Sequence, residues 1–261
     1  MSRPSRLNYA YAVGRVHALE KYLVQHAVFR EAAEATDFLA ALKIIYDAGN
    51  YPEDLTKLRT SEELDAFLRG EEESLRRLLA EIVLEKNILE VFLLEKSPGE
   101  ALGLAERSGY PFIRNYARHR VDLGNLKILG RVKYLGLSQD HLERRLMEGG
   151  WLDKGFFRES YPLSFAEVGE KLRSSSYREA WERGTDILES RETFIGLEKE
   201  MEDFLMGYLR EAKKITFGPE PVFAYGEAKR KELALIRLLG VGKVNLIPAE
   251  WLKERMSATY V

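Results

Sequence analysis

The chain has 261 residues, of which 45% are hydrophobic and 31% are charged, a composition typical of a globular protein with a substantial buried core. Forty Lys and Arg side chains oppose 42 Asp and Glu side chains, so the formal net charge of -2 excludes a global electrostatic attraction to nucleic acid or anionic lipid. The absence of cysteine excludes disulfides, thiolate metal sites and a cysteine nucleophile.

The beginning of the chain, MSRPSRLNYAYAVGRV, is basic but lacks the uninterrupted apolar stretch of a signal peptide. The most apolar tract, residues 82–94, is interrupted by charged and polar side chains, whereas a bilayer span needs roughly 20 apolar residues. We therefore expect a chain that does not itself cross a membrane.

Apolar residues recur at three- and four-residue spacing along most of the chain, and the eight prolines lie almost wholly between these stretches. This pattern predicts an all-α fold. We expect helices near residues 7–30, 31–48, 61–96, 112–135, 138–148, 164–181, 188–213, 221–239 and 248–256. The segments between them are rich in Gly and Pro, as turns are.

Two pairs of segments repeat along the chain. LKILGRVKYLGLSQDHLERRL, from Leu126, aligns with the segment that begins 110 positions later, so that Gly130 pairs with Gly240 and Lys133 with Lys243. A second alignment, offset by 126 positions, pairs Leu39, Leu42, Tyr46, Tyr51 and Leu55 with Phe165, Val168, Leu172, Tyr177 and Trp181. Repeats of this kind indicate one helical module used more than once, although two amphipathic helices can also align by chance.

The C-terminal segment GPEPVFAYGEAKRKELALIRLLGVGKVNLIPAEWLKERMSATYV resembles the C-terminal signature of the AC39/d family of V/A-type rotary ATPases. The signature positions are Gly218, Pro219, Glu220, Pro221, Tyr225, Lys229, Lys243 and Pro248. YAYAVGRVHALEKYL, near the start, and VDLGNLKILGRVKYLG, in the middle, are also similar to the family. Between Leu94 and Pro111 the chain has a short link where most relatives carry further helices, so we expect an abbreviated member.

The resemblance implies pseudo-symmetric, repeated helical bundles around a central funnel. The expected modules are residues 1–110, shortened, 111–187 and 188–261, packed as one globular unit. The implied function is that of a non-catalytic central-stalk subunit, a socket that couples the rotor shaft to the membrane proteolipid ring in an ion-transporting ATPase or ATP synthase. The implied partners are the shaft subunits and the ring, at the cytoplasmic face of the cell membrane, with peripheral association and no nucleic acid.

No catalytic, cofactor or metal site is expected. The segment GVGK, residues 240–243, resembles the end of a phosphate-binding loop, but Arg237 replaces the earlier glycine and Val244 replaces the hydroxyl residue. We expect Gly242 to end a helix in a left-handed conformation instead. The four histidines lack metal-ligand spacing, and His119, between two arginines, is expected on a solvated helix face. The carboxylate-rich segments, such as residues 198–203, are expected to be mostly solvated.

A helical DNA-binding or adaptor module is the alternative function. The helices joined at residues 245–248 resemble a helix-turn-helix, with residues 247–256 as the recognition helix. That helix presents two acids and two bases, a poor surface for a polyanion.

A locally basic stripe suggests where the shaft docks. At 100° per residue, Arg120, Gly124, Lys127 and Arg131 lie within about 60° of one another on one helix. The 110-residue offset places Arg230, Ala234 and Arg237 at the first three equivalent positions, with Val241 at the fourth. We predict that both stripes orient an acidic shaft foot, and an ordinary exposed helix face is the alternative.

Overall fold

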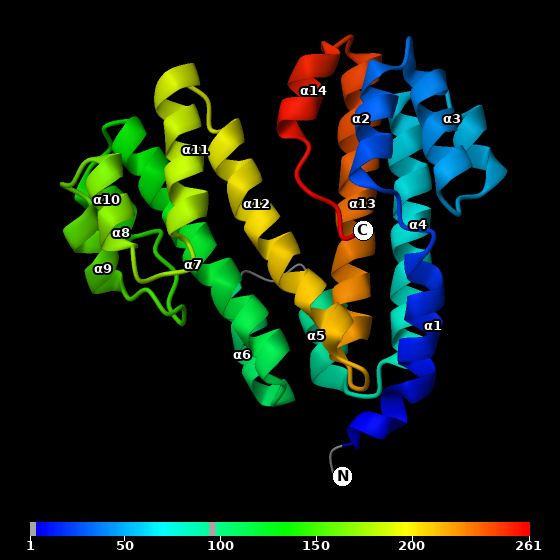
Figure 1. Ribbon diagram of the computed structural model, residues 1–261, viewed down its shortest axis with the longest axis horizontal. Helices are drawn as coiled ribbons and strands as arrows, with labels where there is room; N and C mark the ends of the chain where they lie inside the picture. Colours follow the sequence, from blue (N-terminus) through cyan, green and yellow to red (C-terminus); the bar gives the residue numbers. More distant parts are fainter. Residues whose placement is uncertain (1–3, 94–97) are drawn as a thin grey trace. The chain divides into compact units, whose positions relative to one another are not determined.

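The computed structural model describes residues 4–93 and 98–261 (Figure 1). By their internal contacts these residues form two compact units: unit 1 comprises residues 1–93 and 209–261, and unit 2 comprises residues 94–208. All regular structure in the described part of the chain is helical, which confirms the predicted all-α class. The division into modules of residues 1–110, 111–187 and 188–261 stays a prediction.

The helices of unit 1 come from both parts of the chain that form it. They are η1 (Arg6–Tyr9), α1 (Ala10–Glu20), α2 (His26–Glu34), α3 (Phe38–Ala48), η2 (Glu53–Lys57), α4 (Ser61–Ile82), α5 (Lys86–Leu93), η3 (Glu211–Lys214), α13 (Glu220–Val244) and α14 (Ala249–Arg255). Those that begin in unit 2 are α6 (Pro98–Ser108), α7 (Pro111–Tyr134), α8 (Gln139–Glu143), α9 (Lys154–Ser160), α10 (Phe165–Lys171), α11 (Arg178–Arg191) and α12 (Ile195–Arg210).

Local sequence fixes several helix starts. The Thr60 side chain accepts the Glu63 N–H while the Glu63 carboxylate accepts the Thr60 N–H, a capping box at the start of α4. Ser164 and Glu167 form the same box at the start of α10. Because the first turn of a helix has free N–H groups, these side chains replace the solvent that would otherwise bind them.

The longest helix of each unit lies at its centre. In unit 1, α13 contacts α1, α2, α3, α4 and α5, and its Ile236 and Leu239 are fully buried in a core with Ile45 and Leu64. In unit 2, α7 contacts α6 and α8, and its Leu126 belongs to a second core. Helices surrounded on several sides are apolar around most of their circumference, as α13 is.

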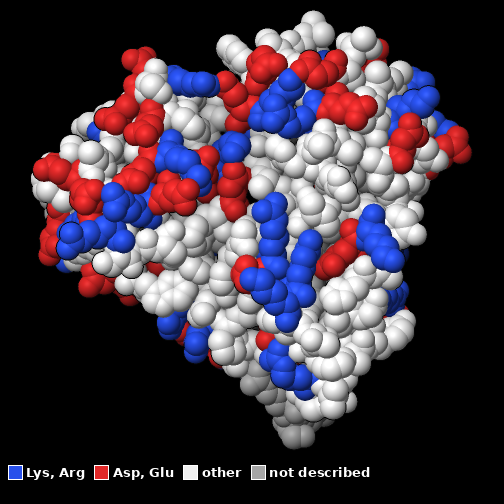
Figure 2. Space-filling model, in the orientation of Figure 1, with Lys and Arg blue, Asp and Glu red and all other residues white. Residues whose placement is uncertain are grey.

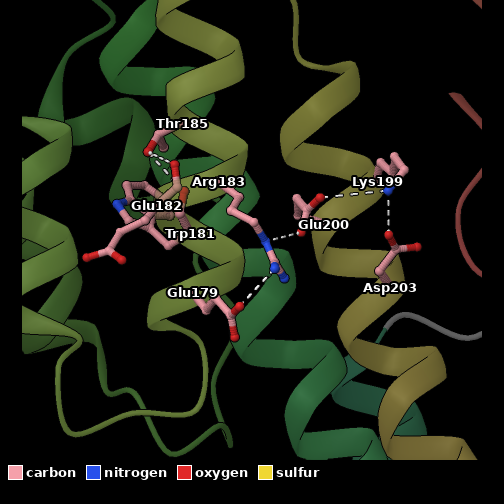
Figure 3. Close-up of polar contacts among 8 residues, drawn as sticks. All are labelled: Glu179, Trp181, Glu182, Arg183, Thr185, Lys199, Glu200 and Asp203. Atoms are coloured by element: carbon pink, nitrogen blue, oxygen red, sulfur yellow. Dashed lines mark hydrogen bonds and ion pairs between the residues drawn. The ribbon is translucent and has the colours of Figure 1, made fainter. Parts of the chain in front are cut away.

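A chain of ion pairs joins α11 to α12 in unit 2 (Figure 3). Arg183 contacts Glu179 and Glu200 at 2.8 Å each, and Lys199 contacts Asp203 at 2.6 Å and Glu200 at 3.7 Å. The Glu200 side chain is 11% exposed, so the expectation of a solvated face is wrong for this carboxylate. It is held between two cations from two helices.

Several predicted helices are interrupted. The helix expected at residues 61–96 ends at Ile82 because Tyr9 binds the chain beyond it: its hydroxyl accepts the Leu84 N–H and donates to Glu85. The link expected between Leu94 and Pro111 contains α6, and its residues 94–97 lie outside the described residues.

Shorter breaks divide other predicted helices. The helix expected at residues 7–30 is broken at residues 21–25, that at 31–48 at residues 35–37, and that at 164–181 at residues 172–177. The helix expected at residues 188–213 begins later, because α11 ends at Glu192 in a left-handed conformation with φ of 54°. The prediction also missed α9. Among the described residues no helix combines the length and the apolar character that crossing a bilayer requires.

Candidate functional site

A buried polar cluster, here called the lysine node, joins α13 to distant segments of unit 1. Glu232 is 3% exposed and accepts hydrogen bonds from the Tyr51 hydroxyl, the Val24 N–H and, at 2.6 Å, the Lys229 ammonium. Lys229 also donates to the Tyr51 hydroxyl at 2.9 Å and lies 4.1 Å from the centre of its ring. Burial, and then the charge of Glu232, raise the pKa of Tyr51 well above its ordinary value. Tyr51 is therefore a neutral donor, and the buried carboxylate has an adjacent cation.

A second cluster, the histidine node, occupies the core of unit 2. Asp122 is fully buried and accepts the Tyr177 hydroxyl at 2.9 Å, the Trp151 N–H at 2.9 Å and the Leu152 N–H at 3.1 Å. His119 Nδ1 lies 2.8 Å from the same hydroxyl. Since the single hydroxyl proton goes to Asp122, Nδ1 carries the proton of the neutral imidazole and donates it.

The predicted solvated position of His119 is wrong. Its ring is packed against the rings of Trp151, Tyr177, Phe204 and Tyr208, with centroids 4.7 to 5.6 Å away. Desolvation lowers its pKa from 6.5 to about 4. The flanking arginines suggested exposure, but on a helix successive residues point 100° apart, so neighbours in sequence need not share an environment.

The two nodes are related by the offsets found in the sequence. Asp122 and Glu232 are 110 positions apart, as are His119 and Lys229, and Tyr51 already aligned with Tyr177 at the second offset. Both tyrosines donate to the carboxylate of a long helix and accept from the residue three positions before it. Chance similarity of amphipathic helices does not produce matching polar contacts, so the predicted repeat is confirmed for these segments.

The aligned lysines near the ends of the long helices also have matching contacts. The Lys243 ammonium donates to the carbonyl of Ala35, the residue that ends α2, at 2.6 Å. The Lys133 ammonium donates to the carbonyl of Tyr161, which ends α9, at 2.9 Å, and to that of Leu163. A cation at free carbonyl groups of a helix end is favourable. Lys243, a signature position, therefore fastens α2 to α13.

The GPEP signature forms the start of α13. Gly218 has φ of 131°, a conformation that L side chains rarely adopt, and a Cβ there would overlap Glu220 and approach Arg6. Glu220 is 3% exposed and pairs with Arg6 at 2.9 Å, while Pro219 and Pro221 stand at and just inside the helix start.

The remaining signature positions are also structural. Tyr225 lines a cavity of about 160 Å³ beside the lysine node, together with Lys229 and Glu71, whose pKa is raised by burial. Pro248 is the residue before α14. The signature therefore describes how α13 is held in unit 1.

A groove of about 650 Å³ runs between α13 and α14. Leu238, Val241 and Leu252 line it together with Arg237 and Arg255. Figure 2 shows this end of unit 1: the outermost atoms at the α13–α14 turn, at the top of the view, belong to neither acidic nor basic side chains. The groove thus combines an apolar lining with two guanidinium groups.

Gly242 permits this packing from within α13. It is buried inside the helix and has no left-handed conformation, so the predicted helix-ending role is wrong. A Cβ at this position would overlap the Leu252 side chain, and glycine therefore lets α14 lie close to α13. The left-handed residue is Leu246, with φ of 55°.

The structure separates the predicted basic stripe of unit 1. Ala234 and Arg237 line the groove, but Arg237 is held by Asp65 through contacts of 2.7 and 3.1 Å. Arg230 instead pairs with Glu227 at 3.2 Å and lies 4.0 Å from the centre of the Phe92 ring of α5. The stripe residues therefore have different environments.

In unit 2 the stripe is partly covered. Arg131 pairs with Glu198 of α12, and a Cβ at Gly124 would lie 2.5 Å from the Met147 methyl group. Arg120 and Lys127 are half-buried. The docking role of these residues, like that of the stripe in unit 1, stays a prediction.

The sequence profile of the ATP synthase (C/AC39) subunit family matches residues 100–255. The chain belongs to this family. The C-type subunit of the V-type sodium ATPase of Enterococcus hirae is 28% identical to this C/AC39 chain over 157 residues, which make up 60% of the chain and 47% of that relative. The matched region thus spans about half the length of the relative.

The nodes and the groove were not predicted, but one signal for the nodes was available. Continuing the 110-residue alignment upstream by two helical turns pairs Asp122 with Glu232 and His119 with Lys229. Two polar positions that recur on two otherwise apolar helices indicate a buried polar contact.

Proposed function

We propose that this C/AC39 chain is a non-catalytic subunit of the central stalk of a V/A-type rotary ATPase. In this function it connects the rotor shaft to the membrane proteolipid ring from the cytoplasmic face, and its partners are the shaft subunits and the ring. Membership of the C/AC39 family is the observation that carries the proposal. The relative from the V-type sodium ATPase supports it, within the half of that protein that the chain matches.

The built-in contacts of each unit suit the transmission of torque. A coupling subunit must resist sliding of one helix along another, and close-packed interiors are hard to deform. In addition, each node fixes the central helix to a loop by hydrogen bonds of defined geometry, and such bonds are lost if the helix shifts by a fraction of a turn. These features favour a rigid coupling element.

Reconstitution tests the proposal. Purified shaft subunits and detergent-solubilised ring are mixed with and without this chain, and the amount of shaft that co-purifies with an affinity-tagged ring is measured. We expect association to depend on the chain, with a heat-unfolded sample as the negative control. Equal recovery of the shaft with and without the chain would contradict the proposal.

A further inference from the structure

The turn between α13 and α14 exposes three apolar side chains close together in sequence. Val244 is 40% exposed, Leu246 88% and Ile247 36%, and we call these residues the apolar tip. Trp251, on the following helix, is 64% exposed. Single exposed apolar residues are ordinary, but several within eight positions form a surface that binding to a partner would bury.

Leu246 is also strained. Its φ of 55° lies in the left-handed region, where Cβ crowds the backbone of any L residue other than glycine. The aligned position in unit 2, 110 residues earlier, is Gly136, with φ of 62°. The same turn thus forms with glycine in unit 2 and with a strained, exposed leucine in unit 1. Strain that folding does not require is an indication of function.

The neighbouring groove has the dimensions and lining of a helix-binding surface. Ala234, Leu238 and Val241 follow one another at spacings of four and three, so they form one face of α13. The small side chain of Ala234 allows another backbone to approach closely, and Leu252 of α14 forms the opposite wall. A volume of about 650 Å³ accommodates several apolar side chains of a third helix.

The charge of the groove restricts the occupant. The lining residues include two arginines and no carboxylate. Arg237 is already paired with Asp65, whereas Arg255 is exposed and has no ion-pair partner among the described residues. The unmatched positive charge at the rim therefore favours an occupant that brings a carboxylate.

We propose that the groove and the apolar tip together receive an amphipathic helix of the shaft foot. The apolar face of that helix packs on Leu238 and Val241, a carboxylate at its edge meets Arg255, and Leu246 packs against its side. The identity of the partner rests on the proposed function. The location of the contact rests on the groove, the unmatched arginine and the strained leucine.

Leu246→Gly provides a test with little risk to the fold, because glycine is the residue that forms this turn in unit 2. Val241→Arg places in the groove the residue found at the aligned position, Arg131. Leu7, in η1, is 66% exposed and lies far from α14 in sequence, so Leu7→Ala is the matched control for loss of an exposed apolar side chain. Helical content by circular dichroism confirms that each variant is folded.

Shaft binding is measured by surface plasmon resonance with immobilised shaft subunits. We expect Leu246→Gly and Val241→Arg each to raise the dissociation rate at least tenfold, Arg255→Glu to lower the association rate and its dependence on salt, and Leu7→Ala to have no effect. Folded groove variants with wild-type kinetics overturn the proposal, as does a loss confined to ring binding or a gain in binding to anionic vesicles. Failure of the wild-type chain to bind the shaft at all would instead reject the proposed function.

Discussion

In the core of unit 1 a tyrosine hydroxyl and a carboxylate meet a lysine, whereas in unit 2 the corresponding tyrosine and carboxylate meet a histidine. The lysine node holds Glu232 beside an ammonium group, and the histidine node holds Asp122 with neutral donors only. A shared backbone arrangement thus tolerates different charges, provided that every buried polar group has a partner.

The carboxylates also differ in length, and the loops that they bind differ accordingly. Glu232 reaches the Val24 N–H, whereas the shorter Asp122 accepts two successive N–H groups, from Trp151 and Leu152. A Cβ on Gly150 would overlap the Asp122 carboxylate, so the loop comes this close only because residue 150 is glycine. One methylene in a side chain is therefore matched by one glycine in a loop.

The largest effect is expected for Glu232→Ala. The substitution leaves Lys229, 13% exposed, without its anion and removes the acceptor of Tyr51 and Val24. Breaking a buried pair in this way costs roughly 3 to 5 kcal/mol in the free energy of unfolding. Urea denaturation, with hydrogen exchange of α2 and α13 amides, measures it. Glu232→Ala combined with Lys229→Met should recover part of the loss, and a loss below about 1 kcal/mol for the single variant would show that the node does not stabilise unit 1.

Acidification should affect the histidine node next. Its folded-state pKa of about 4 lies below the ordinary 6.5, so the unfolded chain takes up the His119 proton first as the pH falls. Between pH 6.5 and 4, unit 2 should lose on the order of 3 kcal/mol, at about 1.4 kcal/mol per pH unit, with no loss from this group above pH 6.5. Asp122 reduces the net loss because burial raises its pKa, and its folded form therefore takes up a proton more readily.

Hydrogen exchange of α7 amides across this pH range gives the measurement. In His119→Gln the α7 amides should show a flatter pH dependence, and an unchanged profile in that variant would assign the acid sensitivity to other groups.

Gly150→Ala should lower the free energy of unfolding by roughly 1 to 3 kcal/mol, because the new methyl group forces the loop away from Asp122. Gly207, in α12, has open space at its Cβ position, and Gly207→Ala should be neutral or stabilising by about 1 kcal/mol. Thermal unfolding of both variants compares them. Equal midpoints would mean that the loop has room that the contacts do not indicate.

The smallest effect is expected for Arg237→Ala, which removes an exposed pair with Asp65. Such pairs contribute about 0.2 to 1 kcal/mol and are screened by salt. Urea denaturation at low and high salt measures the change. A larger loss, unaffected by salt, would indicate that Arg237 supports the packing of α13 on α4.

Long helices with regular apolar spacing were predictable from the sequence. The helix expected at 112–135 is α7, Pro111–Tyr134, and that expected at 221–239 is α13, which continues to Val244. Gly240 and Gly242 signalled an earlier end, but both are buried where a Cβ would overlap a leucine of a neighbouring helix. A glycine that ends a helix and one that allows close packing look alike in one sequence.

The groove and the nodes depend on contacts between segments far apart in the chain, and periodicity carries no information about them. Val24 and Glu232 are 208 positions apart, and Lys243 and Ala35 are equally distant. The basic stripe illustrates the same limit. Helix geometry placed Arg230 and Arg237 on one face, yet their partners, Glu227 and Asp65, decide how much charge is left for binding.

The number of ions transported per ATP hydrolysed, in vesicles that contain the rotary complex with and without this chain, tests the proposed coupling most directly. If the chain connects shaft to ring, its removal should abolish ATP-driven ion transport while the catalytic head continues to hydrolyse ATP, and adding the chain back should restore transport. An unchanged ratio of ions to ATP in complexes that lack the chain would contradict the proposal.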